Sequence, residues 1–97
     1  MPRAFLVVHG VVQGVGYRYH VMAAARKHSI RGFVRNVSDG SVEILADYEN
    51  IGKLEGFIRD INVDTNYGPQ VFQIEKDERR LKEFEQESFE KFDIMVL

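Results

Sequence analysis

Residues 31–48, RGFVRNVSDGSVEILADY, contain two alternating segments separated by the residues SDG at 38–40. Asp-Gly between two such segments predicts a β-hairpin, because the primed turns that join antiparallel strands need positive φ angles. Val42, Ile44 and Ala46 share one face of the second segment, so we expect that strand to be half buried. The remaining elements are assigned outward from this hairpin.

Upstream of the hairpin, the sequence predicts a strand, a loop and a helix. Residues 3–12 (RAFLVVHGVV) are apolar on both alternating faces, which is typical of a strand inside a sheet. Residues 19–28 (YHVMAAARKH) place apolar side chains at helical spacing and end in basic residues, which suit a helix C-terminus. Residues 13–17 then form the loop between the strand and the helix.

Downstream of the hairpin, the sequence predicts a second helix and a further strand. Residues 50–62 (NIGKLEGFIRDIN) have apolar side chains at helical intervals behind Asn50, which is a suitable N-cap. Gly-Pro at 68–69 breaks this pattern, and VFQIE resumes alternation with Phe72 and Ile74 on one side.

The C-terminal part is predicted less completely. Residues 77–91 (DERRLKEFEQESFEK) suit either a short helix or an irregular excursion, and the sequence does not decide between them. Residues 92–97 (FDIMVL) are apolar enough to pair as a short last strand. The order is therefore β-α-β-β-α-β with a terminal extension. It predicts an α+β, ferredoxin-like βαββαβ sandwich: an antiparallel sheet with two helices on one face and a short C-terminal strand.

Composition indicates one compact domain. The chain has 97 residues, of which 44% are hydrophobic, enough for a single core, so we expect one domain over 1–97. The sequence contains no cysteine, which excludes disulfides and thiolate metal sites. The apolar run at the N-terminus is too short for a signal peptide, and no later run approaches the ~20 residues of a membrane span.

Charge is distributed unevenly along the chain. The net charge is −2, but the residues up to Gly40 include six basic side chains against one acidic side chain. The remaining residues include seven basic and fourteen acidic side chains. An anion is therefore expected to bind to the first half of the chain.

Residues 13–17 (QGVGY) and the following Arg18 hold the most informative pattern for function. Two glycines before a helix let the backbone turn tightly and present N–H groups to an anion. Arg18 falls near the first helical turn, where the helix dipole disfavours a positive charge by about 0.3–1 kcal/mol. A bound dianion would offset that cost, since guanidinium matches phosphate. A tight connection beside a solvated arginine explains the same residues equally well.

Two stretches resemble the signatures of one family. Residues 8–18 (VHGVVQGVGYR) resemble the first signature of the acylphosphatases, and residues 32–44 (GFVRNVSDGSVEI) resemble the second. They occur in the family's order and at its distance, and the family's βαββαβ core matches the predicted element order. The chain departs from the family in having Val11 where a basic residue is commoner and Tyr17 where phenylalanine is commoner.

The resemblance implies metal-independent hydrolysis of acyl phosphates, which are carboxyl-phosphate mixed anhydrides, to a carboxylate and inorganic phosphate. It makes Arg18 the phosphate-binding arginine and Asn36 the residue that orients the attacking water. The loop that binds the substrate phosphate corresponds to Gly14, Val15, Gly16, Tyr17 and Arg18. Taken alone, Asn36 is more typical of a residue beside a hairpin turn.

The histidines do not predict a further cofactor. His9, His20 and His28 lack the spacing of a metal site, so we expect neither a metal nor a cofactor. His20 lies two residues beyond Arg18, within reach of the site, but a place on the helix surface is more typical of such a residue.

Two other functions fit parts of the sequence. Residues 31–37 faintly resemble an RNA-recognition motif, but the net charge is negative and the first strand has no stacking aromatic beyond Phe5. A binding domain that kept the anion pocket and lost turnover is the second alternative, and the presence of both Arg18 and Asn36 disfavours it. We therefore expect a small acyl phosphate as the ligand, inorganic phosphate as the product, no nucleic acid, no membrane, and a cytoplasmic monomer.

Overall fold

A computed structural model describes residues 1–96 of the chain. Its elements, in order, are β1 (Arg3–Val11), α1 (Tyr17–Lys27), β2 (Arg31–Asn36), β3 (Val42–Asp47), α2 (Ile51–Ile61), β4 (Gln70–Lys76), the 3₁₀ helix η1 (Glu78–Phe84) and β5 (Phe92–Met95). Leu97, the end of the strand predicted over 92–97, lies outside the described residues. No helix within residues 1–96 has the length and apolarity needed to cross a membrane.

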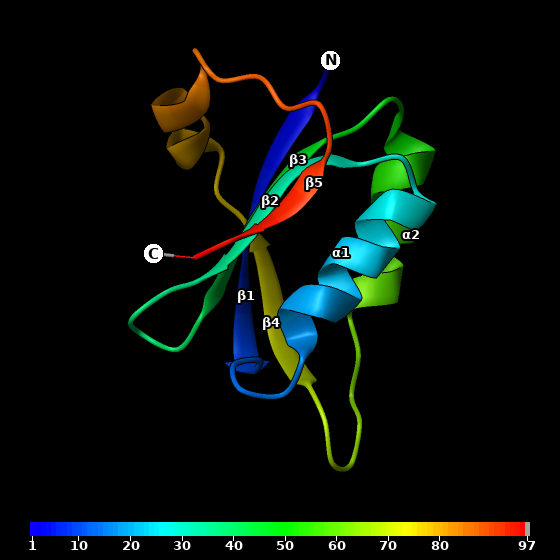
Figure 1. The fold of residues 1–97 in the computed structure, drawn as a ribbon, viewed down its shortest axis with the longest axis vertical. Helices are drawn as coiled ribbons and strands as arrows, with labels where there is room; N and C mark the ends of the chain where they lie inside the picture. Colours follow the sequence, from blue (N-terminus) through cyan, green and yellow to red (C-terminus); the bar gives the residue numbers. More distant parts are fainter. Residues whose placement is uncertain (97) are drawn as a thin grey trace.

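The strands form one five-stranded sheet in the order β4-β1-β3-β2-β5. β1 pairs antiparallel with β3 and β4, and β2 pairs antiparallel with β3, which confirms the predicted βαββαβ topology. β5 differs, because it lies parallel to β2 at the edge of the sheet. The strands β1, β2 and β5 consequently run in the same direction, downward in Figure 1.

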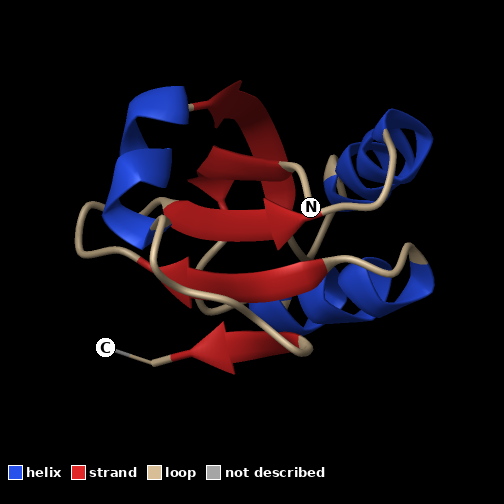
Figure 2. Cartoon of the chain, turned by 90° about the horizontal axis from the view of Figure 1, so that it is seen from above, coloured by secondary structure: helices blue, strands red, loops and turns tan. Residues whose placement is uncertain are grey.

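Both α-helices cover one face of the sheet, as predicted (Figures 1 and 2). The larger core lies between them and the strands, and it includes Leu6 and Val8 of β1, Val21 of α1 and Phe57 of α2. The predicted N-cap of α2 is confirmed, because Asn50 Oδ1 accepts a hydrogen bond from the Lys53 amide at 3.0 Å.

The opposite face of the sheet is covered by η1 and the irregular chain that follows it (Figure 2). The segment left open by the sequence is therefore a short 3₁₀ helix and then an excursion. Phe84 of η1 packs against Phe5, Phe33 and Leu45 in a second, smaller core. All six residues of β3 are buried as a result, so the expectation of a half-buried strand was wrong.

The β2–β3 hairpin is present, but its turn is not a two-residue primed turn. The Val37 amide donates to the Ser41 carbonyl at 2.9 Å, which leaves a three-residue loop. Gly40 has φ +93°, whereas Asp39 is not among the residues with positive φ. A three-residue loop that ends in a glycine of positive φ needs left-handed backbone at only that one position.

The pairing of β4 with β1 also departs from strict alternation. Val8 faces Ile74 and His9 faces Gln73, but Gly10 faces Val71, so Phe72 is left over as a bulge. Val71 and Ile74 pack against the core, and Phe72 is 72% exposed. The prediction that Phe72 and Ile74 share one side was therefore wrong, because the extra residue shifts the alternation.

Candidate active site

The loop between β1 and α1 is held at both of its ends by buried side chains. Val12 and Tyr17 are each 1% exposed, and the Tyr17 hydroxyl donates to the Ile61 carbonyl at 2.9 Å. Burial raises the pKa of the Tyr17 phenol well above its usual value, so the hydroxyl stays a donor. Tyr17 begins α1 and does not end the loop as predicted. The loop between these two buried residues is residues 13–16.

The two glycines of this loop have the conformation that the sequence pattern indicates. Gly14 has φ +74° and Gly16 has φ +77°, both in the left-handed region that L side chains rarely adopt. Both are exposed, and an added Cβ would meet no atom within 4 Å at either position. Backbone conformation, and not crowding, therefore explains the glycines, and the loop surface is open.

Helix α1 starts without a side-chain cap. Its N-cap is Gly16, which has no side chain, and its first turn contains no acidic residue. The Gly16 carbonyl accepts the His20 amide, but no amide from Gly14 to Tyr19 donates to an acceptor within residues 1–96. The start of α1 thus combines unpaired amides with the positive end of the helix dipole, an arrangement that attracts anions.

Arg18 lies in this first turn and is half buried. It makes no ion pair or hydrogen bond with any residue in the described part of the chain. By contrast, Arg3, Arg35 and Arg80 each contact a carboxylate of β3. Arg18 therefore carries a charge that internal contacts do not neutralise, beside a loop of unpaired amides.

Asn36 is the last residue of β2 and pairs with Val42 of β3. Its side-chain oxygen, Oδ1, is buried and accepts no hydrogen bond from residues 1–96. A buried acceptor without a partner costs about 1–3 kcal/mol, so its presence calls for an explanation. One such explanation is that the oxygen accepts a hydrogen bond from a molecule that binds at the site.

The loop and the end of β2 are brought together by Gln13, which the sequence reasoning did not single out. Gln13 Nε2 donates to the Val37 carbonyl at 2.7 Å and to the Ser41 carbonyl at 2.8 Å. These contacts place the β1–α1 loop beside the hairpin that follows Asn36, at the lower end of the molecule in Figure 1. The sequence signal that could have identified Gln13 is a polar residue between a buried strand and a glycine turn.

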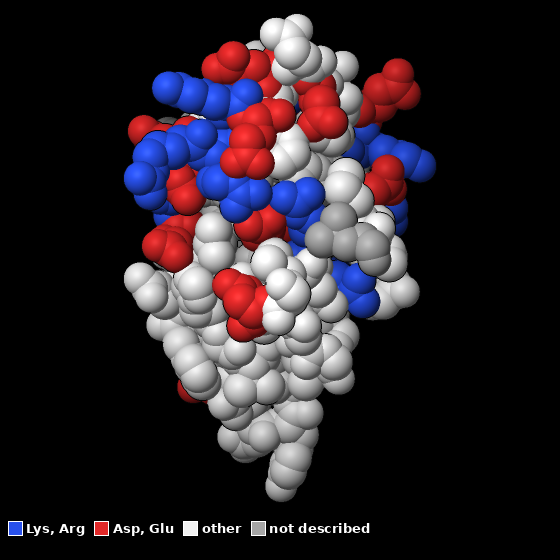
Figure 3. Space-filling model, turned by 90° about the vertical axis from the view of Figure 1, so that its left-hand side faces the viewer, with Lys and Arg blue, Asp and Glu red and all other residues white. Residues whose placement is uncertain are grey.

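Charged side chains are concentrated away from this end on the face that carries η1. Figure 3 shows Lys, Arg, Asp and Glu gathered in the upper part of that face, over η1 and the chain around it. The lower part of the same face shows few charges.

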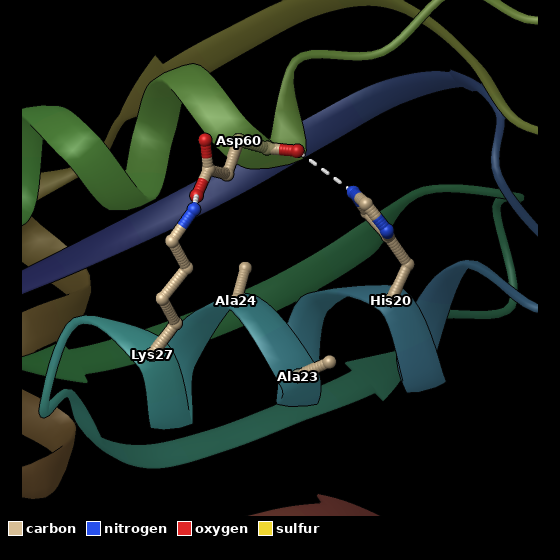
Figure 4. A pocket seen from close by; sticks show the side chains of 5 residues that line it. All are labelled: His20, Ala23, Ala24, Lys27 and Asp60. Carbon is tan, nitrogen blue, oxygen red and sulfur yellow. Dashed lines mark hydrogen bonds and ion pairs between the residues drawn. The ribbon is translucent and has the colours of Figure 1, made fainter.

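His20 faces the second helix. Its Nε2 lies 2.7 Å from the Asp60 carbonyl, and it lines a hollow of about 320 Å³ together with Ala23, Ala24, Lys27 and Asp60 (Figure 4). Lys27 Nζ lies 3.4 Å from Asp60 Oδ2 in this hollow. The lining contains no residue of the glycine loop and no residue of β2, so the hollow is separate from the candidate site.

Comparison with known proteins identifies the family. A sequence model of the acylphosphatase family matches residues 4–94. An acylphosphatase from Methanospirillum hungatei JF-1 is 41% identical over 81 residues, which cover 84% of this chain and 88% of the relative.

Two solved structures extend the comparison. The acylphosphatase from Bacillus subtilis superposes with a TM-score of 0.79 at 31% identity, covering 98% of this chain and 99% of that chain. The T. kodakarensis HypF structure superposes with a TM-score of 0.78 at 29% identity, but the match covers only 12% of that longer protein. Together with the family match, these findings confirm the resemblance in residues 8–18 and 32–44: the chain belongs to the acylphosphatase family of hydrolytic enzymes.

Proposed function

We propose that this chain hydrolyses acyl phosphates at the β1–α1 loop, with Arg18 and the loop amides binding the phosphoryl group and Asn36 orienting the attacking water. The observation that carries the proposal is the pairing of an unneutralised Arg18 with an uncapped helix start. Amides and a guanidinium both stabilise negative charge on phosphoryl oxygens. The family to which the chain belongs supports the substrate class.

The leaving group explains why so few functional groups are needed. When the bond between phosphorus and the acyl oxygen breaks, the electron pair leaves with a carboxylate, whose conjugate acid has a pKa of about 4. Such a group departs without a general acid. Phosphoryl transfer through a loose transition state then depends mainly on positioning and charge stabilisation, which Arg18 and the loop amides supply.

Asn36 supplies the orientation of the water. A carboxamide is not a base, but its oxygen accepts and its nitrogen donates hydrogen bonds. The buried, unpartnered Oδ1 of Asn36 is a suitable acceptor for a hydrogen bond from a water aligned with the phosphorus. As the water oxygen bonds to phosphorus, its proton passes to a phosphoryl oxygen of the substrate. Arg18 and the loop amides supply the positive charge that stabilises the phosphoryl oxygens, so the proposal involves no metal.

The structure disfavours base stacking on the sheet. Phe5 and Phe33, the aromatic residues that a nucleic-acid-binding module would present on β1 and β2, are each 1% exposed. Phe84 of η1 covers them, with ring centroids 5.7 Å from Phe5 and 5.4 Å from Phe33. The RNA-recognition alternative loses its stacking platform for this reason.

The direct test is hydrolysis of benzoyl phosphate in excess EDTA by the wild type and by Arg18→Gln. We expect wild-type turnover to survive chelation and Arg18→Gln to lose on the order of 100-fold or more in kcat/KM. Arg26→Gln is the matched control, because Arg26 is exposed in the last turn of the same helix. In heavy-oxygen water, the label should enter phosphate and not the carboxylate. If the wild type bound phosphate through Arg18 but released no product, the chain would be a binding domain.

A further inference from the structure

The side chain of Gln13 connects the two halves of the candidate site. One peptide bond joins Gln13 to Gly14 of the phosphate loop, and another joins Asn36 to Val37, whose carbonyl accepts from Gln13. Because both hydrogens of one amide nitrogen are used, on Val37 and on Ser41, the side chain spans the base of the hairpin loop.

The hairpin end that Gln13 contacts is itself rigid. The Val37 amide bonds to the Ser41 carbonyl at 2.9 Å, and the Gly40 amide bonds to the Val37 carbonyl at 3.0 Å. Asp39 Oδ1 accepts from the Ser41 amide at 2.9 Å and from the Ser41 hydroxyl at 2.6 Å. Four hydrogen bonds thus hold the turn together. Any displacement of Val37 and Ser41 would therefore move the turn and the end of β2 together.

The glycine loop also has contacts of its own that hold it in place. Val12 and Tyr17 are buried on either side of it, and Tyr17 is tied to Ile61. Loss of the Gln13 contacts would therefore leave the phosphate loop and Arg18 in place. What would be lost is the fixed relation between that loop and Asn36.

We infer that Gln13 is a positioning residue for the proposed reaction, setting the place of Asn36 relative to the phosphoryl group through its paired hydrogen bonds to Val37 and Ser41. This inference rests on the proposed function of Arg18 and Asn36. The inference predicts that loss of the Gln13 contacts lowers kcat but leaves the affinity for phosphate unchanged. The reason is that the orientation of the water affects turnover, whereas phosphate binding depends on the loop. An amide fits this role, since its NH2 group donates two hydrogen bonds and so satisfies both carbonyls.

The test compares Gln13→Met and Gln13→Glu with wild type by kcat for benzoyl phosphate and by Kd for inorganic phosphate. Methionine keeps the length but donates nothing, and a carboxylate would face two carbonyl oxygens. We expect kcat to fall on the order of 10- to 100-fold in Gln13→Met, and further in Gln13→Glu, with Kd for phosphate largely unchanged. Gln13→Asn, which keeps the amide but shortens its reach, covers the case in which methionine prevents folding, and its kcat should fall too.

Gln70→Met is the matched control. Gln70 Nε2 also donates to a loop carbonyl, that of Thr65 at 3.1 Å, but on the β4 side of the molecule. It should retain wild-type kcat. An unchanged kcat in Gln13→Met, or a loss of phosphate affinity as large as the loss of kcat, would overturn the inference. Absence of turnover in the wild type would instead overturn the proposed function itself, so the two failures are distinguishable.

Discussion

At the scale of single residues, Arg18 differs from the three arginines that contact carboxylates of β3. Arg3 makes two bonds to Asp47, at 2.5 and 3.0 Å, and Arg35 and Arg80 share Glu43. These arginines neutralise carboxylates that the sheet buries. Arg18 makes no such contact with residues 1–96, although it sits where the helix dipole already disfavours its charge. A positive group kept in that position is suited to a negative ligand.

The shape of the Arg18 side chain should matter as well as its charge. In Arg18→Lys the positive charge remains, but the planar fork that meets two phosphoryl oxygens at once is lost. We expect phosphate to bind more weakly and kcat to fall by about 10-fold or more, because one strong hydrogen bond to the phosphoryl oxygens of the transition state is missing. Steady-state kinetics with benzoyl phosphate would show it. Wild-type kinetics in Arg18→Lys would mean that Arg18 acts only as a distant charge.

Residue-level prediction of the site from the sequence depended on a known family pattern. The two signatures predict Arg18 and Asn36 as site residues. The structure has Arg18 in the first turn of α1 and Asn36 at the end of β2, and their roles stay predictions. Gln13 was not singled out because its hydrogen bonds are to two carbonyls that lie 24 and 28 residues away in the chain. No local spacing encodes such contacts.

At the scale of elements, the segment from η1 to residue 91 depends on side chains that reach across the sheet. Arg3 donates to the Phe84 carbonyl at 2.6 Å and to the Glu87 carbonyl at 2.9 Å, and its guanidinium lies 5.5 Å from the Phe89 ring centroid. The hydrogen bond to Asp47 raises the pKa of Arg3, which remains charged. The excursion is thereby fastened to β1 and β3.

Loss of the Arg3 contacts should destabilise the fold. Arg3→Ala would leave the Asp47 carboxylate, whose side chain is 9% exposed, without its partner. We expect the free energy of unfolding to drop by about 3 kcal/mol, because an uncompensated buried charge is costly. Arg79→Ala is the control, since its side chain is 96% exposed and it should change stability little. Equal urea midpoints for the two variants would contradict this account.

The elements also show what periodicity can and cannot predict. The helices, the hairpin and the Asn50 cap were predicted because apolar spacing and turn residues are local signals. The bulge at Phe72 was not, because it is defined by pairing with β1. The burial of β3 on both faces was missed for a related reason: the sequence did not show that η1 covers the second face.

At the scale of the whole molecule, stability should depend on pH through several carboxylates. The Ser41 hydroxyl and amide lower the pKa of Asp39, the His28 ring lowers that of Asp60, and Lys53 lowers that of Glu49. A carboxylate with a lowered pKa in the folded state stabilises that state above its unfolded pKa, about 3.9 for Asp and 4.3 for Glu. This stabilisation is lost as the pH falls through the folded pKa.

We therefore expect the free energy of unfolding to decline on acidification below about pH 5, where carboxylates begin to protonate in the unfolded chain. Asp60→Asn should show a smaller decline, because its side chain no longer titrates. Urea unfolding at a series of pH values measures both slopes. A stability that rises with acidification, or the same slope in Asp60→Asn, would show that these contacts do not govern the dependence.

The central claim is a division of labour across the lower end of the sheet: the glycine loop and Arg18 bind the phosphoryl group, and Asn36 orients water. The most direct measurement is kcat for benzoyl phosphate alongside Kd for inorganic phosphate in Asn36→Ala. The account predicts a loss of kcat on the order of 100-fold, with the phosphate affinity of the wild type retained. A variant that keeps wild-type turnover, or that loses phosphate affinity along with it, would contradict the claim.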